Sequence, residues 1–247
     1  MRRVALLLSC EHGGAEIPRA YRQHFVGRAA REALASHRGA DFGALWVAKR
    51  LARALGAPLH ATTVSRLLVD TNRSEHHPRL FSEWSEALAP EERETVLDVH
   101  YRPHRARIEE TIEELLRTSA RVLHVAVHSF TPALDGVVRN ADVGLLYDPR
   151  RAEELELAHG WAALLTSDEA KLRVRRNYPY RGVADGLTTA LRKRYRGECY
   201  VGIELELGQA LVGRAGATRA RVALAVERTL RSLLAEHSEA RRERGAR

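Results

Sequence analysis

The residues best suited to chemistry in this sequence are two histidines and several carboxylates that follow or end apolar runs. His12 and Glu16 come just after the first apolar run of the chain, and His128 ends a later one. Two imidazoles and one carboxylate, with a fourth position open to water, are the ligands of a catalytic zinc ion. We therefore predict that His12, Glu16 and His128 bind Zn²⁺, with Glu11 as the alternative carboxylate ligand.

Two further carboxylates, Glu204 and Glu206, are candidates for the base that activates water at such a centre. They are separated by one residue in an apolar run, so both side chains project from the same face if the run is a strand. Buried carboxylates are costly unless a metal ion or a partner group uses them. We predict that Glu206 is the general base and later the acid, and that Glu204 is either that base or the partner of an arginine.

A third group of residues is suited to binding a substrate carboxylate. Asn72 and Arg73 place an amide beside a guanidinium, a combination that binds carboxylates through two hydrogen bonds. Asp70 is predicted to orient one of these side chains or a ligand histidine, although Asp70 and Asn72 would also stabilise a simple turn. Asp41 precedes a predicted helix, as its N-cap or as a supporting residue of the site. The loop residues predicted to line the pocket are Arg139, Tyr180 and Arg181.

The elements that must position these residues follow from the pattern of apolar runs. The runs that predict strands are residues 4–9, 64–70, 122–128, 143–147, 172–176 and 200–207. The amphipathic stretches that predict helices are residues 42–55, 105–119, 151–165, 186–195 and 217–235. Because continuous apolar strands alternate with helices, we expect an α/β fold with a mostly parallel sheet covered on both faces. The carboxyl ends of such strands meet at one edge, where the polar clusters would converge.

Residues 74–103 interrupt this alternation and are predicted to be a long binding loop or lid, with short helices around residues 81–89 and 90–99. Four histidines at irregular spacing are interpreted as surface or lid residues rather than a second metal site: His76, His77, His100 and His104. No linker rich in proline, glycine or serine divides the chain. We predict one domain over residues 1–247, with residues 237–247 as a charged tail without apolar periodicity.

The formal net charge of +8 raises the question of a nucleic-acid partner. The cations are nearly all arginines and alternate with carboxylates along helical stretches such as residues 105–117, and no nucleic-acid-binding signature accompanies them. We interpret the charge as a solvated surface that also attracts an anionic substrate, and we expect no nucleic-acid partner.

Cysteine usage and the lack of long apolar runs suggest a cytoplasmic protein. Cys10 and Cys199 are expected to be small buried side chains, not a disulfide framework. No run approaches the ~20 apolar residues that span a membrane. The apolar segment at residues 4–8 is shorter than the ~7–15 residues of a signal-peptide core, so we predict that it is the first buried strand.

Six motifs in order resemble those of the N-formylglutamate amidohydrolase family. They are SCEHGGAEIP (residues 9–18), DTNRS (70–74), VHSFTP (127–132), VGLLYDP (143–149), NYPYRG with the following ADG (177–186) and GIELELGQ (202–209). The resemblance extends from Ser9 to about Leu234. The chain reads EHGG where glutamate-specific members more often read PHSG, and it spaces His12 and Glu16 as HxxxE where carboxypeptidases have HxxE.

This resemblance implies a fold similar to that of the zinc carboxypeptidases and aspartoacylases, a phosphorylase/hydrolase-like three-layer α/β/α domain whose mixed, mostly parallel sheet has about eight strands. It also implies zinc-dependent hydrolysis of a small anionic N-acyl amino acid such as N-formyl-glutamate, by a monomer or small homo-oligomer. The resemblance implies that His12, Glu16 and His128 bind zinc. It also implies that Asn72 and Arg73 bind the substrate carboxylate and that Glu206 is the base.

Other functions remain open at this point. The nearest enzymatic alternative is a zinc carboxypeptidase or a deacylase that acts on another N-acyl amino acid or a short peptide. A non-catalytic ligand-binding protein with the same fold is the alternative from a different class.

Overall fold

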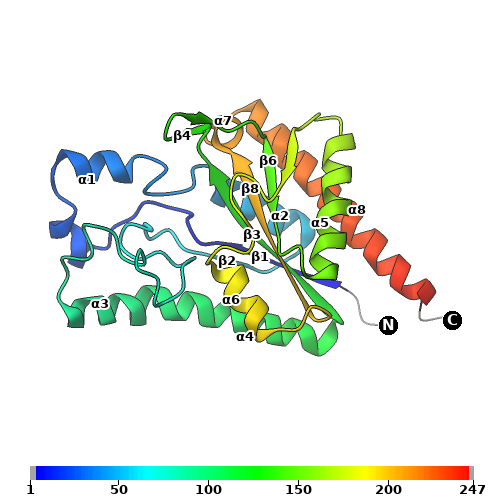
Figure 1. Ribbon diagram of the computed structural model, residues 1–247, viewed down its shortest axis with the longest axis horizontal. Helices are drawn as coiled ribbons and strands as arrows, with labels where there is room; N and C mark the ends of the chain where they lie inside the picture. The colour runs from blue at the N-terminus through cyan, green and yellow to red at the C-terminus, as the bar shows by residue number, and fades with distance from the viewer. Residues whose placement is uncertain (1–3, 245–247) are drawn as a thin grey trace.

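A computed structural model describes residues 4–244, and its centre is a mixed β-sheet (Figure 1). Across the sheet the strands follow the order β2 (Leu59–Ala61), β1 (Val4–Cys10), β3 (Arg121–Phe130), β8 (Tyr200–Gly208), β6 (Val143–Leu146) and β7 (Val174–Arg176). Strands β2, β1, β3 and β8 are parallel, whereas β6 is antiparallel to β8 and parallel to β7. The predicted α/β fold with a mixed, mostly parallel sheet is confirmed. Within the described residues this sheet has six strands, not about eight.

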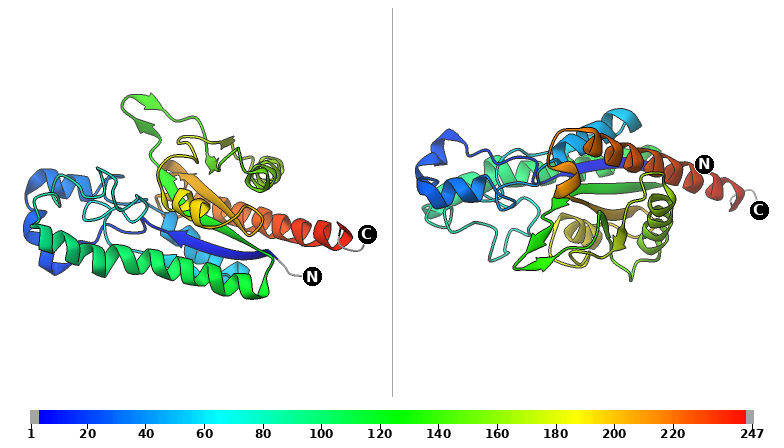
Figure 2. Two further views of the ribbon diagram at one scale, coloured as in Figure 1. Left: turned by 60° about the horizontal axis from the view of Figure 1, so that its bottom comes forward. Right: turned by 90° about the horizontal axis from the view of Figure 1, so that it is seen from above.

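Helices cover both faces of the sheet and give the molecule three layers (Figure 2). One face packs against α2 (Ala44–Leu55), α5 (Ala152–Ser167) and α8 (Ala217–Arg244) in a large apolar cluster. The other face packs against α4 (Arg102–Thr118) and α6 (Leu187–Arg194) in a smaller cluster. Among the described helices, none is long and apolar enough to cross a membrane.

Shorter elements complete the chain. The short helices are η1 (Arg19–His24), α1 (Gly27–Leu34), α3 (Pro90–Val96), the π-helical turn η2 (Leu97–Tyr101) and α7 (Gln209–Val212). A two-stranded hairpin, β4 (Ala133–Leu134) with β5 (Val137–Val138), follows β3. In Figure 1, α1 and α3 lie to one side of the sheet, beyond the carboxyl end of β1.

The central strands form because their sequences are continuous apolar runs that helices bury from both sides. All ten residues of β3 are buried, and successive side chains point to opposite faces. Val125 and Val127 face the layer of α2, α5 and α8, whereas Val122 packs with α4 and α6. The register of β3 on β8 pairs His128 with Glu206, so two predicted site residues lie side by side on the face of Val122.

Residues 64–70 are not the strand that their apolar composition predicts. They form consecutive turns, in which Ser65 accepts hydrogen bonds from the N–H groups of Leu67 and Leu68. Their one β-bridge among the described residues is to Glu16. The apolar side chains are buried in a separate cluster with η1 and α1. An apolar run indicates that its side chains are buried, and here they are buried in packed turns. The strand that pairs with this side of β1 is the short β2.

The five long predicted helices are confirmed, with ends that shift by a few residues. The largest shift is at the C-terminus, where α8 continues to Arg244, so residues 237–244 are helical rather than an irregular tail; residues 245–247 lie outside the described part. The helix predicted at residues 90–99 is α3 followed by η2, which runs into α4. Residues 81–89 form turns instead of a helix.

Candidate metal centre

Three side chains from three different segments meet at the carboxyl edge of the sheet. His12 follows β1, His128 lies near the end of β3, and Asp41 precedes α2. Asp41 Oδ2 is 2.9 Å from His128 Nδ1 and 3.4 Å from His12 Nδ1. All three side chains are buried, and they form a group whose ligand atoms lie within 4.8 Å of one another. This group of two imidazoles and one carboxylate could hold a metal ion.

The backbone around Asp41 explains how a residue so distant in sequence reaches His12. The Asp41 N–H group donates a 2.8 Å hydrogen bond to the His12 carbonyl, which ties the loop to the end of β1. Gly43 then adopts a φ of +86°, and a Cβ atom at this position would approach the Val212 carbonyl oxygen to 2.1 Å. Glycine is therefore required where this loop turns into α2.

Glu16, predicted to be the carboxylate ligand, is not part of this group. After His12 the chain continues in an extended form, and the Gly13 and Glu16 N–H groups donate to the carbonyls of Thr62 and Thr63. The Glu16 side chain is exposed and accepts a 2.8 Å hydrogen bond from the Thr63 hydroxyl. The group that could hold a metal ion therefore contains Asp41, whereas the Glu16 side chain points away from it.

Each imidazole also faces a second carboxylate through its other nitrogen. His12 Nε2 is 2.7 Å from Asp70 Oδ1, and His128 Nε2 is 3.1 Å from Glu11 Oε2. Such outer carboxylates fix the tautomer of a metal-binding histidine. Asp70 thus lies where its predicted orienting role requires, and Glu11 is an outer partner of His128 instead of the alternative ligand.

Neighbouring charges set the pKa values of the carboxyl groups in this cluster. Burial raises the pKa of the Asp41 carboxyl, but Arg66 and the two imidazoles outweigh it and hold that pKa well below its ordinary value. Burial likewise opposes ionisation of Asp70, yet His12 and the nearby arginines lower its pKa to about 2. His12 Nδ1 is buried without a hydrogen-bond partner while Nε2 faces Asp70. If Nε2 carries the proton toward Asp70, the Nδ1 atom, 3.4 Å from Asp41 Oδ2, is the nitrogen that can bind a metal ion.

Glu206 is placed to exchange a proton beside this group. It projects from β8 next to His128, is 5% exposed, and has one buried carboxylate oxygen without a hydrogen bond. Burial raises its pKa to about 7, although the positive charge of His128 lowers it in part. Glu204 lies two residues earlier on the same face and is partly exposed, and its Oε1 accepts a 2.6 Å hydrogen bond from the Thr188 hydroxyl. Both glutamates line a cavity of about 200 Å³ with the three candidate ligands.

The residues predicted to bind substrate surround this cavity. Asn72, Arg73, Tyr180 and Arg181 line it. Asn72 Oδ1 already accepts a hydrogen bond from the Leu187 N–H group, so its amide N–H groups are the part left to bind a ligand. Arg139, the remaining predicted residue, does not line the cavity. Its guanidinium lies 4.8 Å from the centre of the Tyr180 ring, so it contacts a residue that does line the cavity.

Two residues of the site were missed by the sequence analysis. Arg66 forms an ion pair with Asp41 and lines the same cavity, but it falls in the run that was predicted to be a strand. An arginine within an apolar run was the available signal. His104, predicted to be a surface or lid histidine, is buried on α4 with Nε2 3.6 Å from Glu11 Oε1.

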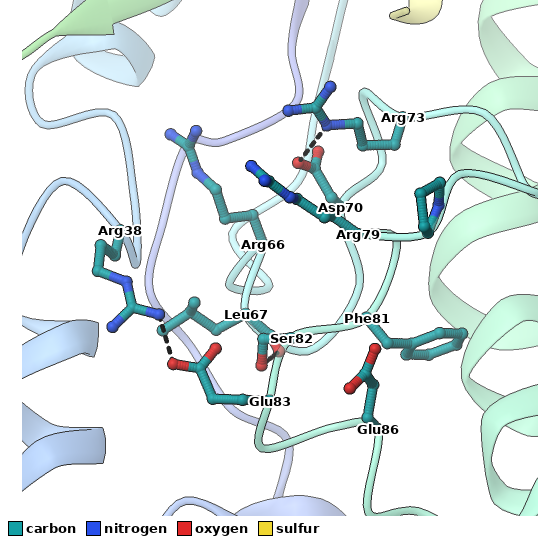
Figure 3. Close-up of a pocket in the computed structure, with 11 residues that line it drawn as sticks. Arg38, Arg66, Leu67, Asp70, Arg73, Arg79, Phe81, Ser82, Glu83 and Glu86 are labelled. Atoms are coloured by element: carbon teal, nitrogen blue, oxygen red, sulfur yellow. Dashed lines mark hydrogen bonds and ion pairs between the residues drawn. The ribbon is translucent and has the colours of Figure 1, made fainter.

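A second cavity of about 510 Å³ adjoins the first and shares Arg66, Asp70 and Arg73 with it (Figure 3). Figure 3 shows the guanidinium groups of Arg66, Arg73 and Arg79 at the end of this cavity near Asp70, with Glu83 at the opposite end. The Arg79 side chain has no hydrogen bond or ion pair among the described residues. Positive charge is thus concentrated where the two cavities meet.

Comparisons with known proteins identify the family and the fold of the chain. Residues 4–212 match the family described as N-formylglutamate amidohydrolase. The fold is similar to that of the crystal structure of gene product Atu2144 from Agrobacterium tumefaciens, with a TM-score of 0.77, 29% identity, and coverage of 94% of this chain and 92% of that one. It is also similar to the N-formylglutamate amidohydrolase from Ralstonia eutropha JMP134, with a TM-score of 0.74, 19% identity, and coverage of 97% and 96%. No curated protein matches the chain.

Proposed function

Because the chain belongs to the N-formylglutamate amidohydrolase family, we propose that it hydrolyses the amide bond of an N-acyl amino acid at a zinc ion held by His12, Asp41 and His128. The favoured substrate is a small anionic N-formyl amino acid such as N-formyl-glutamate. The observation that carries the proposal is the position of Glu206, which lies beside His128 and faces the cavity that the ligand set lines.

Two features of the ligand set suit zinc. Both imidazoles present Nδ1 toward the shared Asp41 oxygen, and both have their Nε2 atoms directed at a carboxylate. Zinc takes such mixed nitrogen and oxygen ligands, and when bound it would polarise the acyl carbonyl and make water more acidic.

Glu206 is proposed to move the proton that hydrolysis requires. Its carboxylate would accept a proton from the attacking water and then donate it to the departing amine. A pKa of about 7, caused mainly by burial, lets this group both accept and donate a proton near neutral pH.

The substrate carboxylates are proposed to bind where the two cavities meet. The amide N–H groups of Asn72 and the guanidinium of Arg73 would hold the α-carboxylate. An acidic side chain would then extend toward Arg66 and Arg79, whose positive charges border the larger cavity. Tyr180 and Arg181 would cover the opposite side, with Tyr180 supported by Arg139.

The proposal is tested by elemental analysis of protein purified without a metal-affinity tag, together with assays of amine release from N-formyl-L-glutamate. We expect about one zinc per chain and measurable hydrolysis. His128→Ala should lose both properties. His76→Ala, which removes an exposed imidazole on the loop before α3, is the matched control and should keep both.

The substrate range separates the proposed activity from its nearest alternatives. Cleavage of a short peptide at its C-terminus, without cleavage of N-formyl or other N-acyl amino acids, would favour a carboxypeptidase. A protein that binds zinc and N-formyl-glutamate but releases no amine would be a ligand-binding protein with this fold.

A further inference from the structure

Behind the candidate metal centre lies a buried group that the proposed chemistry does not use. Glu11 has a side chain that is 0% exposed, and neither of its oxygens has a hydrogen-bond partner among the described residues. Oε2 is 3.1 Å from His128 Nε2, and Oε1 is 3.6 Å from His104 Nε2. A carboxylate removed from water is strongly unfavourable unless cationic or N–H groups compensate it, and these two imidazoles are the groups that do.

His104 reaches Glu11 because of its place on α4. It stands four residues before Ile108 and eight before Ile112, so all three share one face of the helix. Ile108 and Ile112 pack against the sheet in the apolar cluster beneath α6, and His104 continues this face toward the carboxyl edge. The α4 helix thus holds an imidazole against the carboxylate that faces His128.

The contacts of His128 determine which of its nitrogens is free to bind a metal. With Nε2–H directed at Glu11, the Nδ1 atom is the one that faces Asp41 Oδ2 at 2.9 Å. Loss of the Glu11 carboxylate would remove the acceptor that keeps the proton on Nε2 and the ring in this orientation. His12 has the same arrangement with Asp70, so the two ligand histidines are held in matching fashion.

We propose that Glu11 and His104 are positioning residues, which hold His128 so that its Nδ1 binds the metal. The Nε2 atom of His128 faces one oxygen of Glu11 at 3.1 Å, and the Nε2 atom of His104 faces the other at 3.6 Å. This inference rests on the proposed function, because it requires His128 to be a metal ligand.

The test compares zinc affinity, measured by competition with a chelator, in four variants of the full chain. We expect Glu11→Gln to weaken binding by roughly 10- to 100-fold, the range found when outer partners of metal ligands are changed. His104→Leu should weaken it by a smaller factor, since it acts through Glu11. The controls, Glu16→Gln at an exposed carboxylate and His76→Leu at an exposed imidazole, should bind zinc as the wild type does.

A second measurement separates positioning from a purely structural role. In the proton NMR spectrum, the His128 Nε2–H signal should lie far downfield in the wild type, because its proton is shared with a carboxylate, and should move upfield in Glu11→Gln. Denaturant unfolding of the metal-free variants measures any loss of stability. Lower stability with unchanged zinc affinity and an unchanged proton signal would overturn the inference.

These outcomes are distinct from failure of the proposed function. If the wild-type protein binds zinc but releases no amine from N-acyl amino acids, the proposed activity is wrong and the affinity comparison still decides the role of Glu11. If the wild-type protein binds no divalent metal, the metal centre is rejected and the positioning role is overturned with it.

Discussion

The two faces of the sheet at β1, β3 and β8 differ in how residue type changes along the strands. Toward α2, α5 and α8, the inward positions are apolar along the whole strand, as Leu123, Val125 and Val127 illustrate on β3. On the opposite face, β3 begins with the apolar Val122 and ends with His128 at the metal centre. Because strand side chains alternate, one strand can supply a uniform core on one face and a gradual change to a polar site on the other.

His124 marks the middle of that change. It is fully buried, with Nε2 2.7 Å from the Ser9 hydroxyl oxygen and Nδ1 2.8 Å from the Tyr200 hydroxyl oxygen. Burial lowers its pKa to about 4, so it is neutral and has partners for both nitrogens. It is a core residue with both nitrogens hydrogen-bonded, and the site begins four residues later at His128, where carboxylates and a cavity replace the hydroxyl partners.

The largest effect is expected from a variant that removes a charge on the face with the metal centre and keeps the size of the side chain. Glu206→Gln removes the proposed base and keeps the size of the side chain, so we expect kcat to fall by about 10²- to 10⁴-fold. Zinc content should not change, because Glu206 is not in the ligand set. Initial rates on zinc-loaded protein measure the effect, and a variant with nearly normal kcat would exclude Glu206 as the base.

The matching change on the apolar face is Leu205→Ala, one residue away on the same strand. Leu205 is completely buried, so truncation should lower the free energy of unfolding by about 2–5 kcal/mol. The kcat of the folded fraction should stay close to that of the wild type. Leu224→Ala on α8, at a side chain that is 38% exposed, is the control and should change stability by less than about 0.5 kcal/mol. A large loss of kcat in folded Leu205→Ala would show that the two faces are not independent.

The pH dependence of stability provides a third comparison. The pKa of Glu206 in the folded, metal-free protein is raised to about 7, above its value near 4.3 in the unfolded chain. Between these two values the folded state binds more protons, so the Glu206 contribution to stability is present at low pH and is lost as the pH rises through 7.

Glu206→Gln removes this group, so the difference in unfolding free energy between wild type and variant isolates its contribution. We expect the wild type to lose stability relative to the variant from about pH 4.5 to pH 7, and the difference to become constant above that range. Denaturant titrations of the metal-free proteins at several pH values measure it. A difference that does not vary with pH would show that the Glu206 pKa is not raised.

The apolar face that packs against α2, α5 and α8 and the histidines at the carboxyl edge were predictable from sequence, because both follow from short-range patterns. Continuous apolar runs identified β1, β3 and β8, and parallel strands bring their carboxyl ends together, which is why His12, His128 and Glu206 were placed at one edge. The alternation of side chains also placed Glu204 and Glu206 on one face.

What could not be predicted depends on contacts between segments far apart in sequence. Asp41 lies 29 residues after His12 and reaches it through a backbone hydrogen bond that no local pattern encodes. Glu16 is close to His12 in sequence, but the extended backbone directs it to Thr63. Arg66 was hidden because its apolar neighbours are buried in turns, which a run of apolar residues does not distinguish from a strand.

The smallest expected effect concerns the second glutamate of β8. Glu204 Oε1 accepts a hydrogen bond from Thr188 on α6, so this carboxylate is partly engaged in holding the helix against the sheet. Glu204→Ala removes this acceptor, and we expect kcat/KM to fall by roughly 2- to 10-fold, comparable to the loss of one hydrogen bond, whereas Glu204→Gln keeps an acceptor there and should have a smaller effect. Thr188→Val removes the same contact from the other side and should give a similar loss. If Glu204→Gln instead lowers kcat more than Glu206→Gln does, Glu204 is the base. On β8 the reactive part of this face would then begin at Glu204, two residues before Glu206.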